Sequence, residues 1–121
     1  MPLEENSRFI DEYTPIIDAL IGKHALDVAF IDLRNVSEFA DAFIIASARS
    51  DINARTLLEV VTEKLDEAST VYKVEGADSA RWKLIDAGDA VIHIFNKAGR
   101  EFYKLERLWG DAPTTKFENN E

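Results

Sequence analysis

The chain has 121 residues, 46% of them hydrophobic, which suffices for the core of one domain but not of two typical ones. It contains no cysteine, which excludes disulfides, thiolate metal sites and a cysteine nucleophile. The formal net charge is −9, from 23 acidic and 14 basic residues, and so acidic a surface repels a phosphate backbone. We therefore expect no direct sequence-specific binding to nucleic acid. A basic protein is the better electrostatic partner, although the charge can also serve solubility alone.

The N-terminal sequence MPLEENSRF is polar and acidic, unlike a signal peptide or a transit peptide. No apolar run approaches the ~18 residues that suggest a membrane span. We expect a cytoplasmic protein with no membrane partner.

Apolar residues at helical spacing predict an amphipathic helix over 14–22, preceded by a helical lead-in. Pro15 either occupies the first turn of this helix, with Thr14 as its cap, or kinks a longer one. The stretch 25–33 alternates as a strand does. The stretch 42–46 (AFIIA) is apolar on both faces, which predicts a central strand covered on both sides.

Ser50 can cap a second helix, in which apolar residues recur at i, i+3, i+4, i+7, i+11 and i+14 as far as Ala68. A strand is predicted over 70–76, which ends in the sequence VEG. The stretches 82–86 and 90–95 are joined only by the turn sequence AGD. Strands joined so closely must form an antiparallel hairpin.

A final helix can begin after Asn96, which is a good cap, and end at Gly110. Within it, Phe102, Leu105 and Trp109 fall on one apolar face. Because Trp109 ends that apolar stripe, we expect it in the core.

Five strands and three helices place the chain in the α/β class, as a single domain with a mixed five-stranded sheet and helices packed on it. We expect the domain to span residues 1–113. Residues 114–121 are predicted to form a polar, loose C-terminal tail.

Three sequence patterns in the chain belong together. The last third reads W-x-L-[IL]-D-x-G-D-x-V-x-H-I-F and then R-x-F-Y-x-L-E-x-L-W-x-D-A-P. Its matching residues are Trp82, Leu84, Asp86, Gly88, Asp89, Val91, His93, Ile94, Phe95, Arg100, Phe102, Tyr103, Leu105, Glu106, Leu108, Trp109, Asp111, Ala112 and Pro113. A second pattern, D-[LV]-R-x-[LV]-S-x-x-A-D-x-F-[IV]-I-A-S, is matched over 32–47, and the sequence VEG at 74–76 is a third. Together they resemble the signature of the ribosomal silencing factor family, RsfS, also called Iojap-like proteins.

One segment departs from the family pattern. The family usually has S-x-R-Q at the start of the second helix, where this chain has Ile52 and Asn53, and Ala48 replaces a usual glycine. These departures put in doubt any role of that helix start in binding.

The resemblance implies a fold similar to that of nucleotidyltransferases and a function without catalysis. Proteins of this family bind a large-subunit ribosomal protein, the universal fourteenth one, at the face where the small subunit docks. Occupying that face blocks subunit joining and represses translation, so no cofactor is expected. A role in large-subunit maturation is a second implication, and a homodimer stays open.

Trp82 is the first candidate for a partner contact, because aromatic side chains anchor interfaces at little entropic cost. It shares one face of its strand with Leu84 and Asp86, while Lys83 and Ile85 occupy the other face. Alternation alone does not decide which face is core, so Trp82 as a core residue remains an equal alternative. The predicted partner-binding residues are Trp82, Leu84, Asp86, Gly88, Asp89, Glu75 and Gly76.

The competing hypotheses are a nucleotidyltransferase-like enzyme and an interaction domain with another partner. The enzyme needs paired carboxylates for a metal, commonly Asp-x-Asp after Gly-Ser, and the chain has neither sequence. Asp86 and Asp89 could share a cation, but aspartate is common in turns for other reasons. His93 has no nucleophile beside it in sequence, so we predict a packed, hydrogen-bonded histidine rather than a general base. We expect no catalytic residues and no metal site.

Overall fold

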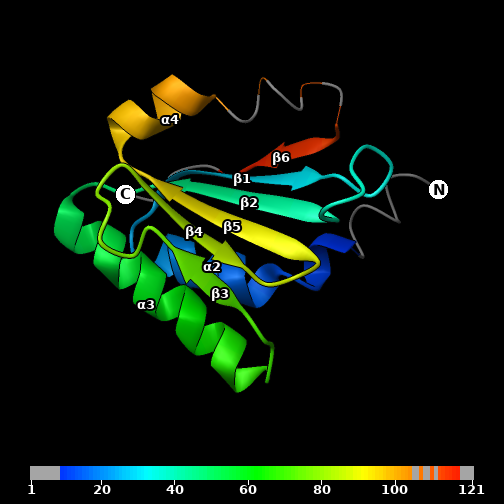
Figure 1. Ribbon diagram of the computed structural model, residues 1–121, viewed down its shortest axis with the longest axis horizontal. Helices are drawn as coiled ribbons and strands as arrows, with labels where there is room; N and C mark the ends of the chain where they lie inside the picture. The colour runs from blue at the N-terminus through cyan, green and yellow to red at the C-terminus, as the bar shows by residue number, and fades with distance from the viewer. Residues whose placement is uncertain (1–8, 105–106, 108–109, 111, 118–121) are drawn as a thin grey trace.

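The computed structural model describes residues 9–104, 107, 110 and 112–117. One mixed sheet of six strands, in the order β3-β4-β5-β2-β1-β6, forms the centre of the chain (Figure 1). The strands are β1 (Leu26–Asp32), β2 (Ala42–Ser47), β3 (Lys73–Glu75), β4 (Trp82–Asp86), β5 (Ala90–Phe95) and β6 (Thr114–Lys116). Neighbouring strands are antiparallel except β2 and β5, which run parallel. The predicted single α/β domain with a mixed sheet is confirmed.

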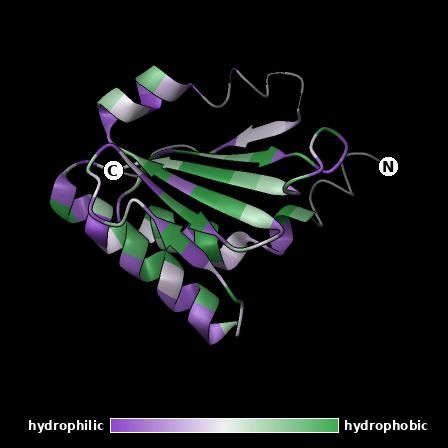
Figure 2. Ribbon diagram, in the orientation of Figure 1, coloured by the Kyte–Doolittle hydropathy of each residue, from purple (hydrophilic) through white to green (hydrophobic). Residues whose placement is uncertain are grey.

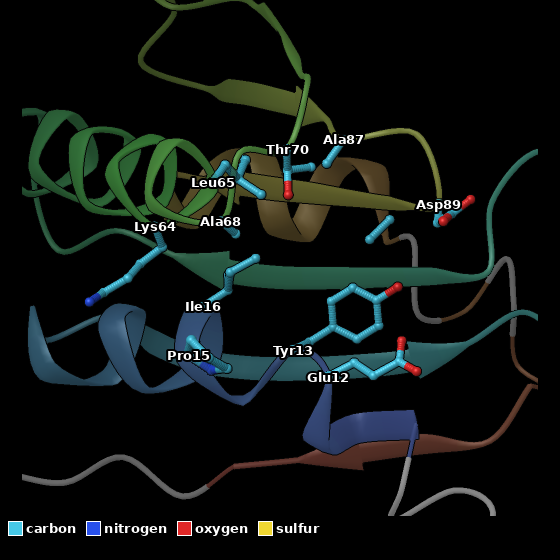
Figure 3. A pocket seen from close by; sticks show the side chains of 11 residues that line it. Glu12, Tyr13, Pro15, Ile16, Lys64, Leu65, Ala68, Thr70, Ala87 and Asp89 are labelled. Carbon is cyan, nitrogen blue, oxygen red and sulfur yellow. The ribbon is translucent and has the colours of Figure 1, made fainter.

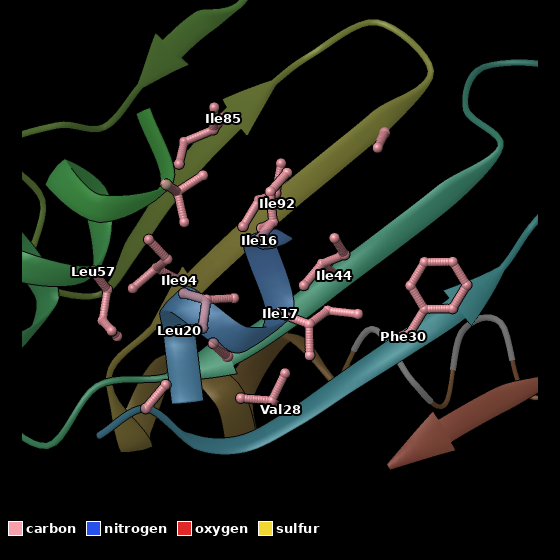
Figure 4. Close-up of a cluster of buried hydrophobic side chains, with 14 of the residues drawn as sticks. Ile16, Ile17, Leu20, Val28, Phe30, Ile44, Leu57, Ile85, Ile92 and Ile94 are labelled. Carbon is pink, nitrogen blue, oxygen red and sulfur yellow. The ribbon is translucent and has the colours of Figure 1, made fainter. Parts of the chain in front are cut away.

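Two helices, α2 (Thr14–Gly22) and α3 (Asp51–Glu67), cover one face of this sheet (Figure 1). Their apolar stripes meet the inward residues of the central strands in one core (Figure 4). Leu20 and Leu57 are fully buried there, and α3 carries hydrophobic and hydrophilic residues in alternation along its length (Figure 2). The hydrophobic periodicity of both helices therefore predicted the covered face correctly.

The caps of the two helices differ in how well the sequence predicted them. The Ser50 hydroxyl accepts a hydrogen bond from the Asn53 N–H at 3.0 Å, which confirms Ser50 as the cap of α3. Pro15 lies in the first turn of α2 as expected. Thr14 is not the cap, because it is already helical and its hydroxyl donates to the Ile10 carbonyl at 3.4 Å.

The sixth strand corrects the prediction of a five-stranded sheet and, for residues 114–117, the prediction of a loose C-terminal tail. Residues 118–121 of that tail lie outside the described residues. Thr114–Lys116 form β6, which pairs antiparallel with β1 and places Thr115 opposite Phe30. Phe117 follows it and packs half-buried against the helix-covered core. All three residues of β6 are exposed and polar, so this edge strand lacks the apolar alternation by which strands are recognised. Where the domain ends along the chain stays a prediction.

The last described helix, α4 (Lys97–Tyr103), begins at the Asn96 cap but ends earlier than predicted. Lys104 adopts a left-handed conformation (φ 47°), which ends the helix there rather than at Gly110. Phe102 is 70% exposed, so the apolar face predicted for this helix is not buried at that residue, and its neighbour Tyr103 packs inward instead. The predictions for Leu105 and Trp109 lie outside the described residues.

None of the helices in the described part of the chain combines the length and the apolar character needed to cross a bilayer.

The place of β6 in the sheet can be tested by proline substitution. Hydrogen bonds link Asp32 to Pro113 and Phe117 to Val28, so the ladder between β6 and β1 engages the Thr115 N–H and leaves the Lys116 N–H pointing outward. Thr115→Pro should lower the free energy of unfolding by about 1–3 kcal/mol, because it removes a ladder bond. Lys116→Pro should change it much less. Equal effects in urea denaturation would contradict this pairing.

Candidate partner-binding surface

The second face of the sheet carries most of the predicted binding residues. On β4, Ile85 is fully buried in the helix-covered core, so Trp82, Leu84 and Asp86 must face the other way. Direct pairing extends this face across the neighbouring strands. We call it the aromatic face, formed by Trp82, Leu84 and Asp86 of β4, Val91, His93 and Phe95 of β5, and Lys73 and Glu75 of β3. Alternation left open which face of β4 belongs to the core. The burial of Ile85 shows that its face packs against the helices, so Trp82 lies on the opposite face.

Trp82 is neither fully buried nor freely exposed on this face. Its ring stacks on Phe95, with 5.3 Å between centroids, and lies 4.4 Å from the ring of Tyr103 at the end of α4. The indole N–H donates to Nδ1 of His93 at 3.0 Å. These contacts fix the orientation of the indole while leaving it half-buried, so Trp82 takes part in packing. A partner contact at Trp82 stays a prediction.

His93 is packed and hydrogen-bonded, as predicted. Its side chain is only 3% exposed, and this burial lowers the pKa of the imidazole from 6.5 to about 4. Because Nδ1 accepts from Trp82, the proton of the neutral ring resides on Nε2. Nε2 is buried without a hydrogen-bond partner among the described residues, and the ring meets Phe43 edge-on at 4.5 Å. The histidine therefore serves Trp82 as an acceptor.

Lys83 has a structural role that the sequence did not indicate. Its side chain is 3% exposed, and its ammonium group donates to the carbonyls of Ala77 and Ser79, both at 2.6 Å. A buried charge needs such partners, and here they come from the loop between β3 and β4. Lys83 thus holds the loop that leads into Trp82.

Two of the predicted residues are glycines that the backbone requires. Gly76 and Gly88 have φ values of 69° and 84°, in the region that other residues rarely adopt. A Cβ on Gly76 would also lie 2.5 Å from the Trp82 carbonyl oxygen, whereas Gly88 has open space. Both are exposed, and they lie at opposite ends of β4. Their part in the surface is to shape its backbone.

The turn between β4 and β5 separates the two aspartates predicted there. Asp86 lies on the aromatic face, and its carboxylate accepts the Gly88 N–H at 2.9 Å, which stabilises the turn. Asp89 instead lines a cavity on the helix-covered side (Figure 3). The structure therefore gathers Trp82, Leu84, Asp86 and Glu75 on one face and places Asp89 apart from them. In the described ranges, no three histidine or carboxylate side chains cluster closely enough to hold a metal ion.

The two glycines provide a matched test of the backbone at this surface. Gly88→Ala should lower the free energy of unfolding by about 1–2 kcal/mol, the usual penalty for a left-handed non-glycine residue. Gly76→Ala should lower it by clearly more, because the new Cβ also displaces the Trp82 carbonyl. Denaturant titration of both variants measures the difference, and equal losses would show that the close approach at Gly76 is not tight.

Burial of His93 predicts a pH-dependent stability. The unfolded chain takes up a proton on this ring below about pH 6.5, whereas the folded protein does so only near pH 4. The free energy of unfolding should therefore fall by about 3 kcal/mol as the pH drops from 6.5 to 4, and His93 should contribute no change above that window. The His93→Asn variant lacks the titrating ring. Its free energy of unfolding should therefore lack this fall of about 3 kcal/mol between pH 6.5 and 4. Identical pH profiles for the two proteins would contradict a buried neutral histidine.

Nearly the whole chain matches a known family, and individual relatives agree. A model of the family described as ribosomal silencing factor during starvation matches residues 6–121. The chain is 42% identical over 92 residues to the Bacillus subtilis protein named ribosomal silencing factor RsfS, covering 75% of this chain and 78% of that protein. It is 26% identical over 98 residues to a Mus musculus protein named mitochondrial assembly of ribosomal large subunit protein 1, covering 78% of this chain and 43% of that protein.

A solved structure agrees with this sequence match. The crystal structure of a protein from Chromobacterium violaceum resembles this fold with a TM-score of 0.77 and 33% identity, covering 80% of this chain and 82% of that one. The resemblance first indicated by the motifs at 32–47 and 82–113 thus extends over the fold. The chain belongs to the ribosomal silencing factor (RsfS) family.

Proposed function

We propose that this protein binds the large ribosomal subunit through its aromatic face and thereby blocks association with the small subunit. The contact on the subunit would be the universal fourteenth large-subunit protein, as the family resemblance implies. The observation that carries the proposal is a half-buried tryptophan, fixed by stacking and by a hydrogen bond, beside a half-buried leucine and two exposed carboxylates. Repression would follow from steric exclusion, so the protein needs neither turnover nor a cofactor, and it would act in the cytoplasm.

The chemistry of the aromatic face suits a basic protein partner. Trp82 and Leu84 supply a rigid apolar centre, and interfaces gain most of their affinity from such anchors. Asp86 and Glu75 are exposed at its edge, where carboxylates steer a cationic partner and fix its register. They outnumber Lys73, the exposed lysine of β3 that pairs with Asp86 on this face. The net charge of −9 also attracts a basic partner over longer distances.

A role in large-subunit assembly is the second candidate, and the mouse relative's name supports it. Both roles use the same surface on the same subunit, so they differ in timing rather than in contact. Binding to mature subunits favours silencing, whereas binding only to immature particles favours assembly. Self-association through the aromatic face is a further proposal, to be checked by measuring the mass of the free protein.

An enzymatic role for a nucleotidyltransferase-like fold has weaker support. One carboxylate oxygen of Asp86 already accepts a hydrogen bond from the Gly88 N–H. Asp89 borders a cavity on the opposite side of the sheet, so the two carboxylates do not converge on one cation. We propose no catalytic activity.

Leu84→Ala tests the proposal with Leu58→Ala as its matched control. Both leucines are half-buried, but Leu58 lies on α3 and packs against the helix-covered core. Leu84→Ala should weaken binding to isolated large subunits at least tenfold, a loss of about 1.4 kcal/mol, whereas Leu58→Ala should bind normally. Co-sedimentation and a subunit-joining assay measure both effects, and wild-type protein should not sediment with small subunits. Wild-type binding to neither subunit, or to both equally, would refute the proposal.

A further inference from the structure

A cavity of about 230 Å³ lies on the helix-covered side, away from the aromatic face (Figure 3). Three segments border it: the start of α2, the end of α3 with the residues after it, and the turn between β4 and β5. It is smaller than the ~300–1,000 Å³ of a typical drug-sized site, so its occupant must be small.

The floor of this cavity is apolar and rigid. Ile16, Leu65 and Ala90 line it, and each is also part of the buried core. The ring of Tyr13 forms a wall and is held edge-on against Phe9, with 5.4 Å between centroids. A short aliphatic chain would find a preformed surface here.

At one end of the cavity, the polar side-chain atoms are all oxygens. The carboxylates of Glu12 and Asp89 lie there beside the hydroxyl of Tyr13, while the amine of Lys64 extends towards the opposite end (Figure 3). Lys64 is 3.5 Å from a carboxylate oxygen of Glu67, which partly neutralises it. Among residues 9–104, no hydrogen bond or ion pair joins the three oxygen-bearing groups to another side chain.

The electrostatics at this end favour a positive charge. Burial raises the pKa of Tyr13 to about 12, and the carboxylates of Glu12, Asp89 and Asp41 add to the rise, so the hydroxyl stays neutral. Arg34 is the opposing charge, but Asp32 holds its guanidinium at 2.7 Å. An anion would be repelled here. Glu12 and Asp89 are exposed, so water solvates them in the free protein, and a cationic group is the ligand that can replace this water with charge-assisted hydrogen bonds.

We propose that this cavity binds a small organic cation, an alkylguanidinium or alkylammonium group on a short aliphatic stem. The stem would lie on Ile16 and Leu65, and the cationic head would donate to Glu12 and Asp89 with the Tyr13 ring alongside. The group can come from a free small molecule or from an arginine or lysine side chain of a bound protein. The site does not depend on the proposed ribosomal function.

Titration with butylguanidinium tests the site, with butylurea as the neutral ligand of nearly the same shape. Amide chemical shifts in two-dimensional NMR should change saturably for residues 12–14, 16, 64–70 and 87–90 with the cation, and butylurea should bind at least tenfold more weakly. Raising the salt concentration should weaken the binding of butylguanidinium and leave the binding of butylurea unchanged. Equal binding of the two ligands, or no saturable change, would overturn the proposal.

Two variants and one control locate the binding. Ala68→Leu should obstruct the cavity, and the double variant Glu12→Gln with Asp89→Asn removes its charges; each should raise the Kd for butylguanidinium at least tenfold. Glu59→Gln removes an exposed charge from α3 without touching the cavity and should have no effect. Melting temperatures confirm that each variant is folded. Unchanged affinity in both folded cavity variants would overturn the site.

The source of the cation is decided by large-subunit co-sedimentation. Weaker sedimentation of Ala68→Leu, together with competition by butylguanidinium, would identify a basic side chain of a subunit protein. Normal sedimentation of a variant that has lost the cation would identify a free molecule. Because wild-type sedimentation is measured alongside, failure of the ribosomal proposal remains distinct from failure of this one.

Discussion

The parallel pairing of β2 with β5 is the constraint on which the two-sided character of this protein depends. Parallel neighbours need a long crossover connection, and here it contains α3. The crossover helix packs on one face of the sheet, and α2 joins it there. The other face meets only α4 at one end among the described helices, which leaves part of its aromatic cluster accessible (Figure 1).

The hydrogen bond from Trp82 to His93 gives this face its definite shape. A tryptophan held by stacking alone could rotate, whereas the bond to Nδ1 requires one orientation of the indole. Burial keeps His93 neutral, so the acceptor persists at physiological pH. Two further residues fix the backbone around Trp82. Lys83 orders the preceding loop through its hydrogen bonds, and Gly76 lacks the Cβ that would clash with the Trp82 carbonyl. A rigid anchor loses little entropy on binding.

Much of this fold could be predicted from the sequence, because its main elements are locally specified. The Ser50 cap and the apolar periodicity of α3 are local signals, as is the turn that fixes the β4–β5 hairpin. Elements that depend on tertiary contacts escaped prediction. The polar strand β6 exists only because β1 offers an edge, and α4 ends at a lysine in a conformation usually reserved for glycine. The sequence grouped Trp82, Leu84, Asp86 and Glu75 with Asp89 as binding residues, and packing places the first four on one face and Asp89 on the other side. Whether they bind a partner stays a prediction.

The central claim is that the aromatic face meets the large subunit. Hydroxyl-radical footprinting of the bound and free protein tests this most directly, because it reports the accessibility of individual side chains. On binding, Trp82 and Leu84 should lose reactivity, while Ile52, which is 74% exposed on α3, should keep it. Protection of Ile52 with unchanged reactivity of Trp82 and Leu84 would contradict the account.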